Sequence, residues 1–169
     1  MLTLISDTHG TDSHRLTGHT LDSVRTADQV IHAGDFTTEA VYDAIEAEAA
    51  ALTAVAGNNE RPALRERLPD EATVEWAGHR ILAVHGHRHS DTALGMLARQ
   101  EDADVVAVGH SHRPEIGELD GRLLVNPGSY ADPRRYRSAY AELAADEGAL
   151  RVRLCSPDGE TFERVTRSR

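Results

Sequence analysis

Five short stretches of the sequence place metal-binding residue types directly after apolar runs. They are Asp7-Thr8-His9, Gly34-Asp35, Gly57-Asn58-Asn59, His85-Gly86-His87 and Gly109-His110-Ser111-His112. Asp, Asn and His offer oxygen and nitrogen donors, a mixture that suits Mn²⁺, Fe²⁺, Zn²⁺, Co²⁺ or Ni²⁺ better than Ca²⁺ or Mg²⁺. These stretches therefore predict a site for divalent transition metals.

The number of candidate ligands points to more than one ion. The seven candidates are Asp7, His9, Asp35, Asn58, His85, His110 and His112. Seven are too many for one tetrahedral site and suit two ions that share a bridging ligand, for which Asp35 is the natural choice. Taken singly, each residue also has a structural explanation, such as a helix cap or a turn, and only the combination favours a metal site. The neighbouring glycines permit tight turns and a close approach of the backbone.

The apolar runs have the pattern of buried strands, with helical patterns between several of them. Strands are predicted within residues 2–6, 29–34, 52–57, 80–86, 104–110 and 122–128. Helices are predicted within residues 37–50, 90–101 and, more weakly, 20–27, with a Thr and Ser90 as N-caps of the first two. This alternation predicts an α/β fold with right-handed crossovers. Ligands of open α/β sheets bind at the carboxyl ends of strands, so the five stretches are expected to converge.

The last third of the chain has a different pattern. Asp120-Gly121 predicts a β-hairpin, and residues 138–156 predict two further strands joined by the sequence ADEG. We therefore expect antiparallel strands after the α/β part. Neither repeats nor low-complexity segments interrupt the sequence, and we expect one domain over residues 1–169.

Composition narrows the classes of function. The 169 residues include 28 acidic and 18 basic ones, for a net charge of −10, and every basic residue is Arg. Such a net charge disfavours nucleic-acid binding. The acidic, lysine-free composition fits either a host with high internal salt or a GC-rich genome. Cys155 is the single cysteine, which indicates a reducing compartment. With no apolar stretch of about 20 residues and no secretory signal pattern, no membrane contact and a cytoplasmic location are expected.

The ordered motifs D-x-H, G-D, G-N-N, H-G-H and G-H-S-H resemble those of the calcineurin-like metallophosphoesterases. The short length, the sequence VHGH and the sequence NPGS at 126–129 are similar to the small YfcE-type phosphodiesterase subgroup. The resemblance extends from Met1 to about Ser156. It implies a two-sheet β-sandwich flanked by helices, a four-layer αββα arrangement, with the metals at one edge.

The resemblance also implies a ligand set and a reaction. One metal would be held by Asp7, His9, Asp35 and His112, and the other by Asp35, Asn58, His85 and His110. A hydroxide bridging the two ions would attack a small phosphate ester, with a phosphodiester as the first expectation. Mn²⁺ is the first expectation for the metal, with Ni²⁺, Fe²⁺, Zn²⁺ and Co²⁺ as alternatives.

The chain departs from the wider family at Asn59, where many members have a histidine. An amide cannot act as a general acid, although it can donate a hydrogen bond to a phosphoryl oxygen. Either the leaving group is a good one or another residue substitutes. His87 is the candidate, with a contact to phosphate or to a metal ligand as the alternative role. Of the other histidines, we expect His14, His19 and His89 to be exposed in loops and His32 and His79 to be structural.

Three other functions remain open. A phosphomonoesterase would use the same motifs, and loop shape would decide between the two substrate classes. A protein-binding scaffold that retains the metal site is a second alternative, since a retromer subunit shares this fold. A metal-dependent nuclease is the third, and the net charge argues against it. The resemblance further implies a homo-oligomer, either a dimer or a tetramer.

Overall fold

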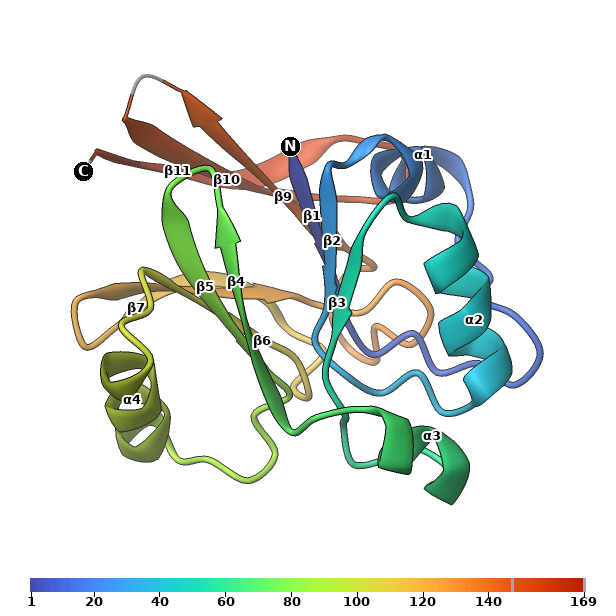
Figure 1. The fold of residues 1–169 in the computed structure, drawn as a ribbon. Coiled ribbons are helices and arrows are strands. Elements are labelled where there is room, and N and C mark those ends of the chain that lie inside the picture. The colour runs from blue at the N-terminus through green and yellow to red at the C-terminus, as the bar shows by residue number, and fades with distance from the viewer. Residues whose placement is uncertain (147, 169) are drawn as a thin grey trace.

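The computed structural model describes residues 1–146 and 148–168, which form two β-sheets packed face to face with helices outside them (Figure 1). The first sheet has the order β11-β10-β9-β1-β2-β3 and the second the order β4-β5-β6-β8-β7. The first sheet contains β1 (Leu2–Ile5), β2 (Gln29–His32), β3 (Leu52–Ala54), β9 (Tyr140–Asp146), β10 (Ala149–Cys155) and β11 (Thr161–Ser168). The second contains β4 (Glu71–Trp76), β5 (His79–Val84), β6 (Val105–Val108), β7 (Pro114–Leu119) and β8 (Arg122–Pro127).

The helices are α1 (Gly18–Thr26), α2 (Glu39–Glu48), α3 (Pro62–Arg67) and α4 (Asp91–Gln100). Two of the predicted helices begin at the side-chain caps that the sequence indicates. Thr38 Oγ1 accepts a hydrogen bond from Val41 N at 3.4 Å, and Ser90 Oγ accepts one from Ala93 N at 3.3 Å. Each cap satisfies one of the amide groups that the first turn of a helix leaves unpaired.

Alternating side chains divide the core into three apolar layers. Leu4 of β1 and Ile81 of β5 lie in the cluster between the two sheets. The opposite face of the first sheet packs against α1 and α2, and that of the second packs against α4. The order helix, sheet, sheet, helix confirms the predicted four-layer αββα fold (Figure 1).

Parallel pairing brings the ends of the predicted strands to one edge. β1, β2 and β3 are parallel neighbours in the first sheet, as are β5, β6 and β8 in the second. The carboxyl ends within each set therefore lie at the same edge of the sheet. The C-terminal strands β9, β10 and β11 pair antiparallel, as predicted. The β7–β8 hairpin turns at Asp120 and Gly121, whose φ angles of 51° and 78° suit a type I′ turn.

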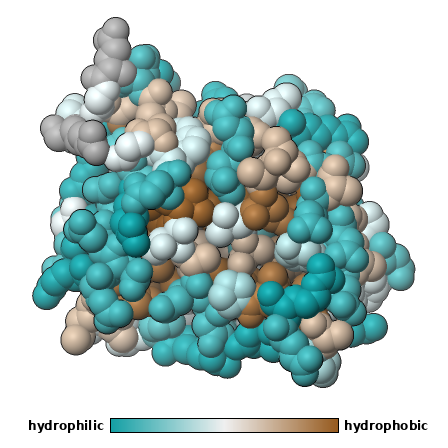
Figure 2. Space-filling model, in the orientation of Figure 1, coloured by the Kyte–Doolittle hydropathy of each residue, from teal (hydrophilic) through white to brown (hydrophobic). Residues whose placement is uncertain are grey.

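Two elements were not predicted. β4 lies at the edge of the second sheet, and its residues alternate between exposed and half-buried, so it lacks an apolar run. α3 has only six residues and begins at Pro62, too few to show a helical period. Among the described residues, no helix has the length and apolar character needed to cross a bilayer. Figure 2 shows hydrophilic residues around the rim of one face and apolar residues near its middle.

Candidate metal centre

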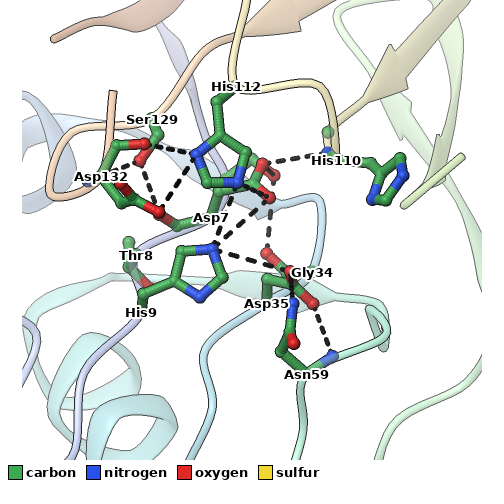
Figure 3. A network of polar contacts seen from close by, with 12 residues as sticks. Asp7, Thr8, His9, Gly34, Asp35, Asn59, His110, His112, Ser129 and Asp132 are labelled. Carbon is green, nitrogen blue, oxygen red and sulfur yellow. Dashed lines mark hydrogen bonds and ion pairs between the residues drawn. The ribbon is translucent and has the colours of Figure 1, made fainter. Parts of the chain in front are cut away.

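The loops after β1, β2, β3, β5 and β6 bring the seven predicted ligands together at one edge of the sandwich. Figure 3 shows part of this arrangement, with side chains from several loops directed toward Asp7 and Asp35. Asp7, Asp35, His85 and His112 are buried, whereas His9 keeps 21% of its side chain exposed. The expected convergence of distant segments is therefore present.

The first group of side chains surrounds one carboxylate oxygen. His9 Nε2 and His112 Nε2 lie 3.3 Å apart, so two ring nitrogens face each other. Asp7 Oδ1 lies 3.2 Å from His112 Nε2 and 3.9 Å from His9 Nε2. This oxygen is buried and makes no hydrogen bond to any described residue. Two ring nitrogens beside an unsatisfied carboxylate oxygen give three ligand atoms that suit a cation.

The second group forms around His85. Its Nε2 lies 3.4 Å from Asp35 Oδ1 and 3.1 Å from Asn58 Oδ1. The ring of His110 stands edge-on to the ring of His85, with centroids 5.2 Å apart. In Figure 3 the His110 ring points away from Asp7, while its backbone N donates to Asp7 Oδ2 at 3.0 Å. His110 therefore lies on the side of the second group.

Two carboxylates connect the groups. Asp35 directs Oδ1 toward His85 and Oδ2 toward His9, whose Nε2 is 3.7 Å away. Asp7 also belongs to both, because its carboxylate, Asp35 and His85 place ligand atoms within 4.8 Å of one another. A bridging carboxylate is thus geometrically available at Asp35, and Asp7 lies close to both groups as well.

Backbone carbonyls fix the orientation of the two buried histidines. His85 Nδ1 donates to Ala33 O at 2.7 Å, and His112 Nδ1 donates to Asp132 O. A carbonyl can only accept, so when these rings are neutral the lone pair is on Nε2 and faces the carboxylates. Lone pairs that face carboxylates need a proton or a cation between them. Metal-binding histidines commonly have this arrangement, so the residues present fit a divalent metal.

The close contacts between carboxylates and histidines also shift the pKa values of these side chains. Burial would raise the pKa of Asp35, but contacts from His85 and Asn59 bring it well below its usual value. Burial lowers the pKa of His85 and of His112, yet the nearby carboxylates of Asp35 and Asp7 raise both above the usual value. Protons and metal ions therefore compete for these histidines.

The backbone at the site is unusual. Five of the predicted ligands have positive φ angles between 36° and 67°, namely Asp7, His9, Asp35, His110 and His112. Such values are uncommon for residues with a side chain and cluster at functional sites. Gly57 shows why glycine is needed here, because a Cβ on it would lie 2.0 Å from Asp35 Oδ1. Because Gly57 has no side chain, the loop can approach closely enough for the amides of Asn58 and Asn59 to donate to that oxygen at 2.9 Å.

Glu60 contributes to the site and was not predicted. Its Oε1 accepts hydrogen bonds from Asp35 N at 2.7 Å and Phe36 N at 3.2 Å, so it holds the loop that presents Asp35. Its Oε2 is buried with no hydrogen bond to the described residues, and burial raises the pKa of the carboxyl. A glutamate that binds backbone amides has no signature in residue type or spacing, apart from its place directly after the G-N-N motif.

The two predicted catalytic residues lie on the side of Asp35 and His85. Asn59 Nδ2 donates to Asp35 Oδ2 at 2.5 Å. The ring of His87 lies 5.3 Å from that of His85 and 6.1 Å from that of His110. Burial and the charge of His85 lower the pKa of His87, so the ring is neutral at pH 7. Its Nδ1 is buried and makes no hydrogen bond within the part of the chain that the structure describes.

Among the remaining histidines, three expectations need correction. His14 is not an exposed loop residue, because Leu16 N donates to its Nδ1 at 2.9 Å and its side chain is only 12% exposed. His89 is half-buried. His19 is exposed, as expected, but it lies in α1 and not in a loop. His32 is fully buried and hydrogen-bonded to Thr8, which confirms a structural place.

Comparisons with known proteins agree with this geometry. Residues 1–148 match the calcineurin-like phosphoesterase superfamily domain. The chain is 33% identical over 165 residues to the probable metallophosphoesterase YsnB of Bacillus subtilis, covering 95% of this chain and 93% of the relative. It is 32% identical over 136 residues to a phosphodiesterase of Methanocaldococcus jannaschii, covering 74% and 81%.

Among solved structures, Vps29 of Chaetomium thermophilum is similar with a TM-score of 0.82 at 21% identity, over 99% of this chain and 98% of that one. This likeness concerns the fold. The match of the superfamily domain and the identity to YsnB over nearly the whole chain go further. The protein belongs to the calcineurin-like phosphoesterase superfamily.

Proposed function

We propose that this metal-dependent phosphoesterase is a phosphodiesterase that uses two divalent ions to hydrolyse a small phosphate diester. The observation that carries the proposal is the pair of histidine and carboxylate groups that meet at Asp35 and Asp7. Membership of the superfamily supports the phosphoester substrate. The relative from Methanocaldococcus jannaschii, which is named a phosphodiesterase, supports the diester. Mn²⁺ is the ion expected first, with Ni²⁺, Fe²⁺, Zn²⁺ and Co²⁺ as alternatives.

In this proposal the seven predicted ligands are divided between the ions. One ion would be held by Asp7, His9, Asp35 and His112, and the other by Asp35, Asn58, His85 and His110. The opposed directions of the two Asp35 oxygens support its role as the shared ligand.

The bound ions would supply an activated water and positive charge beside the phosphoryl oxygens. The protein's own contribution is to hold the ligands in place before substrate arrives. Ala33 O and Asp132 O orient the rings of His85 and His112, and Glu60 holds the loop of Asp35. The residues packed around Asp7 and Asp35 keep both carboxylates away from bulk water, which strengthens the electrostatic interactions within the site.

Asn59 and His87 would contact the phosphate. The amide of Asn59 can donate a hydrogen bond to a phosphoryl oxygen but cannot protonate a leaving group. His87 is neutral at pH 7, since its pKa is lowered, and offers one ring N–H to the same oxygens. Neither residue is a strong acid at neutral pH, so the proposal favours substrates with good leaving groups.

The proposal is tested with bis-p-nitrophenyl phosphate and p-nitrophenyl phosphate, assayed with each metal after purification without chelators. We expect faster hydrolysis of the diester and about two ions per chain by elemental analysis. Asp35→Asn should lower kcat/KM at least a hundredfold, because the shared ligand loses its charge. Asp43→Asn on the exposed face of α2, which removes an equal charge, is the matched control.

Different failures lead to different conclusions. Faster hydrolysis of the monoester would identify a phosphomonoesterase with the same centre. Metal uptake without hydrolysis of any ester would favour the alternative of a protein-binding scaffold that retains the metal site. Substantial activity in Asp35→Asn would contradict the shared-ligand arrangement.

A further inference from the structure

An arginine-rich loop lies next to the candidate metal centre, and its arginines have no part in the mechanism proposed above. It lies between β8 and β9 and carries Arg134, Arg135 and Arg137. The whole chain has a net charge of −10, so three arginines within four positions reverse the local charge. Guanidinium groups match the geometry of phosphate with two parallel hydrogen bonds.

Hydrogen bonds hold the base of this loop against the centre. Ser129 Oγ donates to Asp7 O at 2.7 Å and accepts from Asp132 N at 2.9 Å. Ser138 Oγ donates to Tyr130 O at 2.6 Å, which closes the other end of the loop. The loop is thus anchored to the backbone of a predicted metal ligand.

Asp132 links the loop to the centre a second time. Its backbone oxygen accepts from His112 Nδ1, and its carboxylate Oδ2 lies 3.6 Å from the same nitrogen. The same Oδ2 lies 3.9 Å from Arg134 Nε. Arg134 is therefore one residue removed from a predicted ligand, and its φ of 52° holds the backbone in a conformation uncommon for arginine.

A surface hollow of about 300 Å³ lies under this loop. The residues that line it are Ser111, Arg134, Arg135 and Tyr136. Ser111 stands between the predicted ligands His110 and His112 in the chain, so the hollow adjoins the centre. Its volume suits a phosphate group with part of the group that carries it.

The charges around the hollow leave its arginines available. Arg135 has no carboxylate within 4.0 Å among the described residues. One of its N–H groups donates a hydrogen bond to Tyr136 Oη at 3.1 Å. Within the described residues, the one carboxylate within 4.0 Å of Arg134 is that of Asp132, at 3.9 Å. Arg113, which follows His112, is instead 3.6 Å from Glu115. An anion in the hollow would thus meet two guanidinium groups, and the four described residues that line the hollow include no acidic one.

We propose that this hollow binds a second phosphate group of the substrate, held by Arg134 and Arg135 while the scissile phosphate occupies the metal centre. The proposal rests on the proposed phosphodiesterase function and adds a substrate class to it. The substrate would be a small diester in which one esterified group carries a further phosphate.

The test compares two substrates that differ by one phosphate: thymidine 3′-(p-nitrophenyl phosphate) and its 5′-phosphorylated form. We expect the wild type to favour the phosphorylated form in kcat/KM by about tenfold. Arg135→Gln should abolish most of that preference. Arg137→Gln is the matched control, because it removes the same charge from the same loop but Arg137 is not among the residues that line the hollow, and its guanidinium lies over the Phe162 ring, 4.3 Å away. The control should keep the preference.

Binding provides a readout that does not depend on turnover. Thymidine 3′,5′-bisphosphate, titrated calorimetrically into the metal-loaded protein, should bind Arg135→Gln about tenfold more weakly than Arg137→Gln. Equal affinities would overturn the proposal, as would an equal loss of preference in both variants, which would indicate charge at a distance. If no ester is hydrolysed with any metal, the proposed function fails, and the titration alone decides whether the hollow binds phosphate.

Discussion

At the scale of single residues, Gly57 controls how closely the backbone approaches the carboxylate of Asp35. A Cβ at this position would lie 2.0 Å from Asp35 Oδ1 and 2.6 Å from Asp35 N, so the loop or the carboxylate must move. We expect Gly57→Ala to weaken Mn²⁺ binding by about 10- to 100-fold, which is typical for the loss of groups that orient ligands. Calorimetric titration with Mn²⁺ measures this change.

Gly95→Ala serves as the control for that substitution. Gly95 lies in α4, and its added Cβ would come no closer than 3.4 Å to Asp120 Cβ. The control should bind Mn²⁺ like the wild type. An unchanged affinity in Gly57→Ala would show that the loop tolerates the displacement and that its close approach is not needed.

His32 predicts a pH dependence of stability. Gly34 N donates to its Nδ1 at 3.2 Å, so Nε2 carries the proton and donates to Thr8 Oγ1 at 3.0 Å. Burial and the charge of His85 lower the pKa of His32 well below its usual value of about 6.5. Below about pH 6.5, His32 is protonated in the unfolded chain but stays neutral in the folded protein. The free energy of unfolding therefore falls as the pH falls.

The variant His32→Gln lacks this titration and should escape the loss. We expect the wild type to be more stable at pH 7, with its advantage shrinking by up to about 2 kcal/mol between pH 7 and pH 5. Urea unfolding of both metal-free proteins across this range measures the difference. The raised pKa values of His85 and His112 act equally in both proteins and cancel. A constant difference would mean that His32 titrates in the folded protein as it does in the unfolded chain, which would contradict the lowered pKa.

The sequence predicts those site residues whose own side chains can bind a metal. The seven candidate ligands were found because Asp, Asn and His recur after apolar runs, and the structure places them at one edge. Glu60 was missed because it acts on backbone amides, which have no sequence pattern. Asp132 was missed for a similar reason: its backbone carbonyl orients His112, and any residue carries a carbonyl.

At the scale of elements, the N-cap of α4 is a measurable contribution to stability. Ser90 Oγ accepts a hydrogen bond from Ala93 N at 3.3 Å. The helix α4 packs on the second sheet, and the predicted ligands Asp7 and Asp35 come much earlier in the chain. Ser90→Ala should lower the free energy of unfolding by about 1 kcal/mol, whereas Ser90→Asp, which can also cap, should not. Urea unfolding compares the two. Equal destabilisation by both would assign the effect to something other than the cap.

Strands with long apolar runs can be predicted from the sequence, but the strands with which they pair cannot. The strands β1, β2, β5, β6 and β8 are buried on both faces, which gives them continuous apolar sequences. β4 is an edge strand with polar residues on one face and has no such run. The pairing of Leu2 with Leu143 joins segments from opposite ends of the chain, and local patterns carry no information about it. The two-sheet arrangement was accessible only through resemblance to a family.

At the scale of the whole molecule, the excess of acidic residues sets how salt acts on stability. The net charge of −10 at pH 7 repels itself more strongly in the compact state than in the unfolded chain. Raising KCl shortens the screening length from about 10 Å at 0.1 M to about 3 Å at 1 M, which relieves this repulsion. Exposed ion pairs such as Arg25 with Glu48 weaken at the same time, each by less than about 1 kcal/mol.

We therefore expect the midpoint of thermal unfolding at pH 7 to rise between 0.1 and 1 M KCl. The same series at pH 5.4, near the isoelectric point, is the internal control. There the net repulsion is close to zero and only the attractive pairs are screened, so the midpoint should stay constant or fall. A rise of equal size at both pH values would assign the effect to the hydrophobic term, which salts also alter. Full stability at low salt and pH 7 would argue against adaptation to a host with high internal salt and in favour of a GC-rich genome as the source of the lysine-free composition.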